Sequence, residues 1–346
     1  MLIINQIKKH LPIIPILLGI YLRLNHLASV PADAPFRLGG LFYEFSQQII
    51  TNGYVLPKTI PYYSAGGIPF AYPPLGFYVQ AFIIDLFSPP RFWTVNWIPP
   101  LIAALTVPSF YFLLRKLTDD KKLVLGALLA YALMPAAYTN QIEAAGLAEA
   151  FGTLSLIWYA YFLLSVKDGG KTGSIIGAGI LLATSVASSP GSALGAVAVS
   201  LLLFGQMLLN GSKFTSRLVL VGVLGFAASA PYWLTVLRNH GIAIFSSPIS
   251  GQFNSEAGSW LVKFIYTFFT FNYAGGKFSI LWNVLILLGL FWYVLQNKPF
   301  LPLLFFVLAA IPRESVWLTA LVTPLFAGAG LAYVAYPLLS NGFKKL

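Results

Sequence analysis

The sequence predicts an all-α polytopic membrane protein with about ten transmembrane helices, and three observations lead to this prediction. Of the 346 residues, 58% are hydrophobic and only 9% are charged, unlike the composition of an ordinary soluble domain. The mean hydropathy is +0.78. Apolar runs recur from Leu11 to Leu339, so we expect a single transmembrane domain over residues 1–346.

The composition also excludes several kinds of site. The chain has no cysteine, which excludes a disulfide framework, a thiolate nucleophile and a cysteine-ligated zinc or iron–sulfur centre. Its three histidines, His10, His26 and His240, are far apart in the sequence, so we do not expect a histidine metal cluster.

The first transmembrane helix is expected at residues 11–29, after Lys8 and Lys9. No small-residue cleavage site follows it, so we interpret it as a spanning helix rather than a removed signal peptide. Nine further spans are expected, at residues 92–114, 123–138, 148–166, 172–188, 192–209, 218–237, 278–295, 299–311 and 316–339. The weakest is 299–311, because 13 residues reach only ~20 Å as a helix and the hydrocarbon core is ~30 Å thick.

Two shorter apolar segments, 72–87 and 260–273, are interpreted as re-entrant or juxtamembrane helices on the outer face. The first belongs to a long outer-face loop, residues 30–91, and the second to another outer-face loop, residues 238–277. Residues 41–50 of the first loop have apolar positions at helical spacing, with Glu44, Gln47 and Gln48 opposite, which predicts a helix lying in the membrane interface.

The charges predict the orientation. With this assignment the inner side carries thirteen basic and three acidic residues, a net charge of +10, and the outer side carries seven of each, a net charge of 0. Of the lysines and arginines, Arg23 alone lies within a span. The protein is therefore expected in a plasma or inner membrane, with both termini in the cytoplasm. The net charge of +11 follows from this topology and needs no nucleic-acid partner to explain it.

Acidic residues are costly near lipid, yet seven of the ten fall on the outer side, in two main groups. Asp33 and Glu44 lie early in the first outer loop. Glu143 lies in the turn at residues 139–148, and Glu149 directly follows this turn. In the functional interpretation these carboxylates converge to take a proton from an acceptor and to hold a cation or a sugar hydroxyl. In the structural interpretation Asp33 caps a helix and Glu149 complements a helix dipole.

Basic and aromatic residues on the outer side allow two interpretations as well. Arg238 and Arg313 lie where helices leave the membrane; they are candidates for binding a lipid phosphate, and interfacial snorkelling is the alternative. A tyrosine cluster around a Pro-Pro turn is predicted either to line a groove for an isoprenoid chain or sugar, or to form an aromatic belt. Its members are Tyr62, Tyr63, Tyr72 and Tyr78.

The order of these features resembles the membrane glycosyltransferases of the GT-C fold. This class uses polyprenyl-phosphate sugars and includes protein mannosyltransferases, aminoarabinose transferases and the catalytic subunits of oligosaccharyltransferases. The resemblance covers residues 11–210. It rests on Asp33 in the first loop, on Gly53-Tyr54-Val55-Leu56-Pro57, on Gly67-Ile68-Pro69-Phe70-Ala71-Tyr72-Pro73-Pro74-Leu75, on a basic inner turn and on Glu143-Ala144-Ala145-Gly146-Leu147-Ala148-Glu149.

The resemblance implies a role for each candidate residue. The first-loop acid would assist the acceptor or a metal, the second-loop acids would complete the site, and late basic residues would bind the donor phosphate. The implied catalytic residues are Asp33, Glu44, Glu143 and Glu149, and the implied phosphate ligands are Arg313 and Arg238. The cofactor stays open: the resemblance allows a divalent cation, Mg²⁺ or Mn²⁺, and the departures described below allow a metal-independent enzyme. Membrane lipid or a membrane protein partner is expected to bind.

Three departures from the family pattern keep alternatives open. The first-loop acid is not followed by a second acid, the second loop lacks an Asp-x-Asp motif, and a large C-terminal soluble domain is not present in these residues. We predict an inverting glycosyltransferase that takes a sugar from a polyprenyl-phosphate donor at the outer face, with Asp33 as base and Arg313 as phosphate ligand. The alternative is a non-catalytic GT-C-like membrane subunit that binds lipid or a partner complex.

Overall fold

The computed structural model describes residues 11–30, 34–62, 65–142, 146–212, 215–245, 279–311 and 315–343. The chain forms two compact units. Unit 1 comprises Met1–Leu24, Ala104–Thr139 and Val262–Leu346, and unit 2 comprises Asn25–Ala103 and Asn140–Leu261. Helix α5 (Trp93–Leu117) contributes residues to both.

Four helices in the described part are long and apolar enough to cross a membrane: α5, α8 (Leu147–Lys167), α10 (Pro190–Leu209) and α11 (Thr215–His240). Five shorter helices are also apolar: α2 (Ile13–Leu24), α4 (Leu75–Phe87), α9 (Thr172–Ser188), α14 (Ser279–Leu295) and α15 (Phe300–Ala309). Each of the nine overlaps an apolar segment identified in the sequence.

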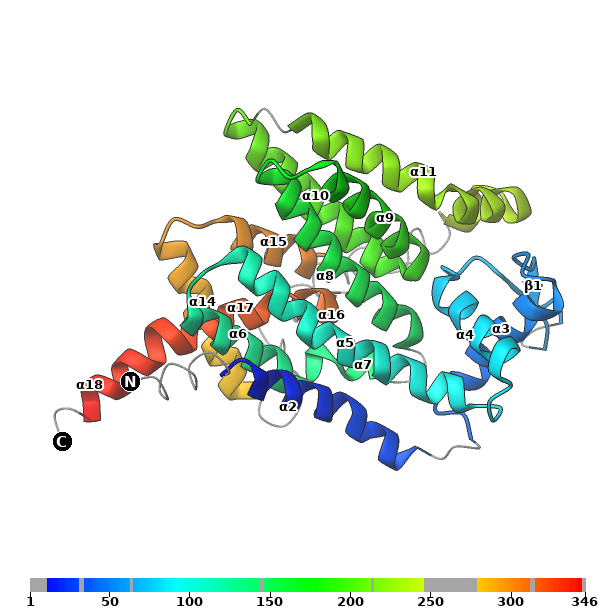
Figure 1. The fold of residues 1–346 in the computed structure, drawn as a ribbon, viewed down its shortest axis with the longest axis horizontal. Coiled ribbons are helices and arrows are strands. Elements are labelled where there is room, and N and C mark those ends of the chain that lie inside the picture. The colour runs from blue at the N-terminus through cyan, green and yellow to red at the C-terminus, as the bar shows by residue number, and fades with distance from the viewer. Residues whose placement is uncertain are drawn as a thin grey trace. The chain divides into compact units, whose positions relative to one another are not determined.

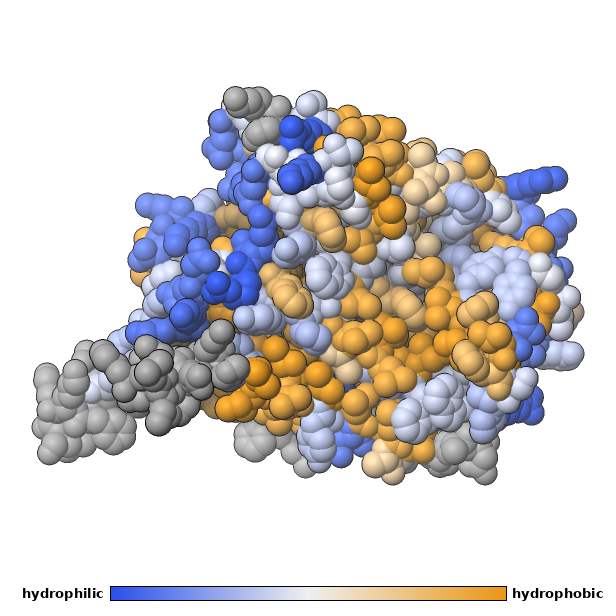
Figure 2. All heavy atoms as spheres, in the orientation of Figure 1, coloured by the Kyte–Doolittle hydropathy of each residue, from blue (hydrophilic) through white to orange (hydrophobic). Residues whose placement is uncertain are grey.

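Large apolar side chains are exposed along these helices. Leu201 on α10, Phe226 on α11 and Ile280 on α14 expose 65%, 64% and 78% of their surface. Figure 2 shows hydrophobic atoms over much of the face toward the viewer. Such surface is unfavourable in water and is expected where a protein contacts lipid. Together with the apolar helices it identifies an integral membrane protein.

In unit 2, helices α8, α9, α10 and α11 pack side by side, in green in Figure 1. Glycines allow α9 and α11 to approach closely, because a Cβ atom on Gly179 would lie 2.8 Å from Leu224, and one on Gly225 would lie 2.5 Å from Leu182. Small residues at helix contacts are typical of membrane bundles.

The segment at residues 34–91, for which an outer-face position is predicted, is folded around an aromatic core in unit 2. Helix α3 (Gly39–Thr51), which covers the interfacial helix expected at 41–50, packs on α4. The ring of Phe45 lies 4.7 Å from that of Phe70 and 4.8 Å from that of Phe77. Between the helices β1 (Thr59–Ile60) pairs antiparallel with β2 (Ile68–Pro69), a short ladder that the all-α prediction did not include.

In unit 1, three helices meet with almost no space between their backbones. Helix α17 (Thr323–Ala329) packs on both α14 and α6 (Lys121–Leu133). A Cβ atom on Gly328 would lie 2.4 Å from the backbone nitrogen of Ala127, and one on Gly289 would lie 1.8 Å from the carbonyl oxygen of Phe326. These positions therefore accept only glycine without a shift of the helices.

Arg23 lies in the last turn of α2 and is fully buried in unit 1. Its guanidinium carbon lies 5.0 Å from the ring centroid of Tyr131 and 4.9 Å from that of Tyr138. Nη1 donates to the carbonyl of Gly19 at 3.1 Å, and Nη2 donates to the carbonyl of Tyr131 at 3.2 Å. The cation is thus held by two aromatic faces and two backbone carbonyls, which tie α2 to α6.

The last predicted span, 316–339, differs from the expectation of one continuous helix. The structure divides it into α16 (Ser315–Thr319), α17, a π-helical segment η4 (Gly330–Ala335) and α18 (Tyr336–Phe343). Pro324 in the first turn of α17 has no backbone N–H to continue a preceding helix. The break before α17 therefore has a local cause in the sequence.

Candidate functional site

Glu149 lies in the first turn of α8, and its side chain is half-buried. The free backbone N–H groups at a helix start favour a negative charge, so the position suits a carboxylate, as the structural interpretation expects. Gly146 is the residue before the helix and supplies no side-chain cap. Glu149 is thus the acidic residue in the first turn of α8.

Tyr72 brings the first outer loop to this carboxylate. Its hydroxyl lies 3.5 Å from Glu149 Oε1, a long hydrogen bond in which the tyrosine donates. The ring belongs to the aromatic core of the loop, with its centroid 6.0 Å from that of Phe77. Pro73 and Pro74 follow directly and restrict the backbone before α4 begins. One side chain thus joins two segments that the sequence analysis selected separately.

Tyr232 on α11 supports the same turn from a third element. Its hydroxyl donates to the carbonyl oxygen of Ala71 at 2.9 Å. The sequence analysis did not select this residue. A signal was present, because Pro231 lies inside the apolar segment 218–237 and a tyrosine follows it directly. The turn that carries Tyr72 is therefore held by a hydrogen bond from 161 residues later in the chain.

Two glycines allow the start of α8 to pack closely against α4 and against the start of α10. A Cβ atom on Gly76 of α4 would lie 3.0 Å from the side chain of Leu147. A Cβ atom on Gly152 would lie 2.8 Å from both Ser189 Oγ and Ser192 Oγ, at the start of α10. The helix end that carries Glu149 is consequently fixed by close packing on both sides, as a site that must keep its geometry requires.

The other described tyrosines of the predicted cluster have separate surroundings. Tyr62 is 85% exposed, with φ of +77°, next to the short β ladder. Tyr78 donates from its hydroxyl to the carbonyl of Tyr54 at 3.2 Å, and the Tyr54 hydroxyl donates to Asp85 Oδ2 at 3.0 Å. Of Tyr62, Tyr72 and Tyr78, the structure brings Tyr72 to Glu149.

Glu44 and Arg238 have clear positions of their own. Glu44 lies on α3, where Gln48 Nε2 donates to its Oε1 at 2.7 Å. Arg238 lies in the last turn of α11 with an exposed side chain. A cation near a helix C-terminus complements the dipole, in agreement with an interfacial anchor.

Four predicted residues, Asp33, Tyr63, Glu143 and Arg313, lie outside the described residues. The elements beside two of them are described. Helix α7 (Thr139–Ile142) ends directly before Glu143, and α16 begins two residues after Arg313. Within unit 1, α16 contacts the 3₁₀ turn η2 (Pro135–Ala137), which precedes α7 in the chain.

The described donor atoms were tested against the implied divalent cation. Mg²⁺ and Mn²⁺ are bound by several oxygen ligands, usually with more than one carboxylate among the protein groups. Among the residues with described coordinates, no three His, Asp or Glu side chains gather as a metal site. Glu149 by itself does not make such a donor set.

Comparisons with known proteins agree with the resemblance seen in the sequence. Residues 71–235 match the family model described as dolichyl-phosphate-mannose-protein mannosyltransferase, a range that includes Tyr72, Glu149 and Tyr232. No curated protein matches the chain by sequence.

Solved oligosaccharyltransferases of Archaeoglobus fulgidus have a similar structure. The enzyme AglB in complex with an inhibitory peptide and a dolichol-phosphate has a TM-score of 0.64 and 15% identity, over 97% of this chain and 52% of AglB. The enzyme in complex with Zn and sulfate has a TM-score of 0.66 and 16% identity, over 95% of this chain and 49% of that one. The chain thus spans about half the length of these enzymes. The predicted resemblance is confirmed: the chain has a GT-C fold.

Proposed function

We propose that this GT-C protein is a membrane glycosyltransferase that moves a sugar from a polyprenyl-phosphate donor to an acceptor at the outer face. The observation that carries the proposal is the contact of Tyr72 with Glu149 at the start of α8. Both residues lie in the range that matches the mannosyltransferase model. A solved enzyme of the same fold is in complex with a dolichol-phosphate, which supports a lipid-phosphate donor.

The proposed topology has about ten spans, with both termini in the cytoplasm and residues 30–91 outside. Its support is the net charge of +10 on the inner side against 0 on the outer side. With this orientation the start of α8, the aromatic core of the first loop and the end of α11 all belong to the outer face. The sugar of a polyprenyl-phosphate donor can reach this face while the polyprenyl chain stays in the bilayer.

The reaction we propose is an inverting displacement. The acceptor oxygen forms a bond to the anomeric carbon, and the bond from that carbon to the phosphate oxygen breaks. The polyprenyl phosphate leaves with the bonding electron pair, and the acceptor proton passes to a carboxylate base, for which we propose Asp33. The leaving phosphate is anionic, so it needs a cation rather than an acid, and we propose Arg313 for that role.

Glu149 has a different role in this scheme. The Tyr72 hydroxyl contacts Oε1. A carboxylate held in this way is suited to orient an acceptor hydroxyl or the donor sugar by accepting a hydrogen bond. Glu143, six residues earlier in the turn, is proposed to complete this acidic side of the site.

The test is transfer from radiolabelled polyprenyl-phosphate sugars by the purified protein in liposomes. We expect wild type to be active with at least one donor, and Asp33→Asn to reduce the rate about 100-fold or more, as expected for loss of a general base. Glu149→Gln should also reduce it, with unchanged thermal stability. The matched control is Asp85→Asn. Asp85 lies on α4 and also accepts a hydrogen bond from a tyrosine hydroxyl, that of Tyr54. It should transfer at the wild-type rate.

The alternative function, a non-catalytic subunit, predicts a different result. Wild type would then transfer from none of the donors, and Asp33→Asn and Glu149→Gln would leave lipid and partner binding unchanged. Equal rates for wild type, Asp33→Asn and Glu149→Gln would also refute the proposed roles.

A further inference from the structure

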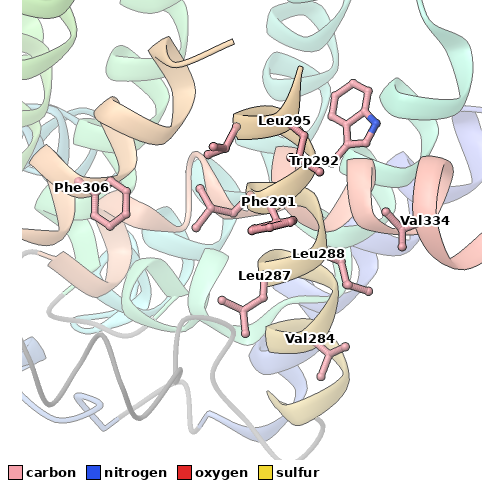
Figure 3. Close-up of a pocket in the computed structure, with 10 residues that line it drawn as sticks. Val284, Leu287, Leu288, Phe291, Trp292, Leu295, Phe306 and Val334 are labelled. Atoms are coloured by element: carbon pink, nitrogen blue, oxygen red, sulfur yellow. The ribbon is translucent and has the colours of Figure 1, made fainter. Parts of the chain in front are cut away.

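A partly open apolar groove of about 630 Å³ runs along α14 in unit 1. Figure 3 shows the α14 side chains between Phe306 of α15 on one side and Val334 of η4 on the other. The α14 side is lined by Leu287, Leu288 and Phe291, and Trp292 lies toward one end. The volume lies within the ~300–1,000 Å³ typical of small-molecule sites.

The groove is open to the surroundings of the protein. Phe291 exposes 66% of its surface, Leu287 37% and Phe306 38%. Polar side chains that would orient a sugar or a nucleotide are missing from its described lining. In a membrane protein such a surface fits a hydrocarbon chain, because burial there needs no hydrogen bonds.

One end of the groove is bounded by aromatic and basic residues. The Trp292 ring stacks on Tyr333 at a centroid distance of 4.3 Å and an interplanar angle of 13°. The ammonium of Lys298, an exposed residue, lies 5.5 Å from the centroid of Trp292. The Tyr333 hydroxyl donates to Asp120, whose Oδ1 accepts from the backbone N–H of Lys122.

The charges at this end indicate what the occupant carries. Lys122 lies next to the same helix ends, with its ammonium 5.7 Å from the ring of Tyr336. Asp120 accepts from Tyr333 and from the start of α6 and also attracts the charge of Lys122, so its carboxylate offsets that lysine. The ammonium of Lys298 beside an apolar groove complements a molecule with a hydrocarbon tail and an anionic head.

We propose that this groove binds one acyl chain of an anionic membrane phospholipid, with the lipid phosphate at Lys298. With the proposed topology the site lies in the cytoplasmic leaflet. The π-helical segment η4 supplies Tyr333 and Val334 to the site, and π-helical turns are frequent where a helix has a function. The inference does not depend on the proposed activity.

The test uses the full-length protein in nanodiscs of phosphatidylcholine with a minor share of phosphatidylglycerol. Native mass spectrometry after gentle release counts the lipids retained and identifies the head group. We expect wild type to retain phosphatidylglycerol in excess of its share in the bilayer. Lys298→Gln should reduce that excess about fivefold, as expected for one lysine near an anionic surface.

Two variants with matched controls separate the groove from its charged end. Leu288→Trp fills the groove and should reduce retention of both lipids, whereas Leu201→Trp, on the exposed face of α10, should not. Lys171→Gln, an exposed lysine before α9, is the control for charge and should keep the wild-type ratio. Thermal stability in detergent checks that each variant is folded.

Three results would overturn the proposal. The first is a phosphatidylglycerol share in the retained lipid equal to that of the bilayer. The second is an unchanged excess in Lys298→Gln. The third is a dimer that Leu288→Trp disrupts, because the groove would then be covered by a second copy of the chain rather than by lipid.

Discussion

At the scale of single residues, the proposed site depends on hydrogen bonds that reach between distant parts of the chain. Tyr72 contacts Glu149, 77 residues later, and Tyr232 donates to the carbonyl of Ala71. In this arrangement Tyr232 positions the turn without touching the carboxylate. Its effect on transfer should therefore act through Tyr72, which makes the two residues experimentally separable.

Tyr232→Phe is expected to reduce the turnover rate about fivefold, which corresponds to the ~1 kcal/mol of one net hydrogen bond. The double variant with Tyr72→Phe should lose less than the sum of the two single variants, because both act on one turn. The measurement is single-turnover transfer in liposomes. Tyr159→Phe, which removes a buried hydroxyl bonded to Ser200, is the control and should leave the rate unchanged. Full additivity would contradict the positioning role.

Asp120 provides a pH-dependent contact. The pKa of the Asp120 carboxyl is lower than its ordinary value, chiefly because the Tyr333 hydroxyl donates a hydrogen bond to it. Burial raises this pKa by less than the hydrogen bond from Tyr333 lowers it, and the backbone N–H groups of Lys122 and Leu123 lower it further. A carboxyl with a lowered pKa stabilises the fold above its unfolded pKa of about 3.9. That contribution is lost as the pH falls through the folded pKa.

Tyr333→Phe should therefore destabilise the protein at pH 7. Its stability should approach that of wild type as the pH falls from about 4 through the lowered pKa of the Asp120 carboxyl in the folded protein. The measurement is the melting temperature in detergent across this range. A difference from wild type that stays constant with pH would mean that the hydroxyl acts by packing alone.

At the scale of elements, close helix contacts in unit 1 depend on glycine. Gly328→Ala would place a methyl group 2.4 Å from the backbone nitrogen of Ala127, so α6 and α17 would have to separate. We expect a loss of about 1–3 kcal/mol, the usual cost of overpacking. Gly222→Ala on α11 is the control, because its Cβ atom would meet open space, and it should keep or raise the melting temperature. Equal melting temperatures for both variants would contradict this account.

The sequence predicted the helices better than their contacts. Residues 172–188 were expected as a helix and α9 covers Thr172–Ser188, because Ser189-Pro190 marks the boundary with α10. Residues 316–339 were expected as one span, and the structure divides them before α17. Apolar composition reports lipid or core contact, but it does not report where a backbone must bend to pack against α14.

The site was predictable only in part for a similar reason. Glu149 and Tyr72 were selected because acids and clustered tyrosines are unusual in such a chain. Tyr232 was not, because one tyrosine in an apolar helix is ordinary, and its significance comes from a partner 161 residues away. A single sequence does not carry that pairing.

At the scale of the whole molecule, the chain passes between the two units four times, at residues 24–25, 103–104, 139–140 and 261–262. Unit 1 is thus built from the beginning, a middle segment and the end of the sequence. The structure of that unit is complete only when all three parts have entered the membrane.

The proposed topology has a direct test at this scale, because the chain contains no cysteine. Single cysteines at Asp119, Lys171 and Tyr62 should react with a membrane-impermeant maleimide in a clear pattern. We expect only position 62 to react in intact cells, and positions 119 and 171 to react after the membrane is opened. Reaction at position 119 from outside would reverse the assignment of the faces.

The buried arginine of α2 has a consequence for how the protein is made. Arg23 lies 108 residues before Tyr131, whose carbonyl and ring help to hold it. At ~5–20 residues per second the ribosome needs roughly 5 to 20 s to synthesise that interval. During this time the guanidinium lacks both of its aromatic neighbours and stays hydrated at the membrane surface by snorkelling. The first helix therefore enters the bilayer at a provisional depth, and its final position is set only when α6 arrives beside it.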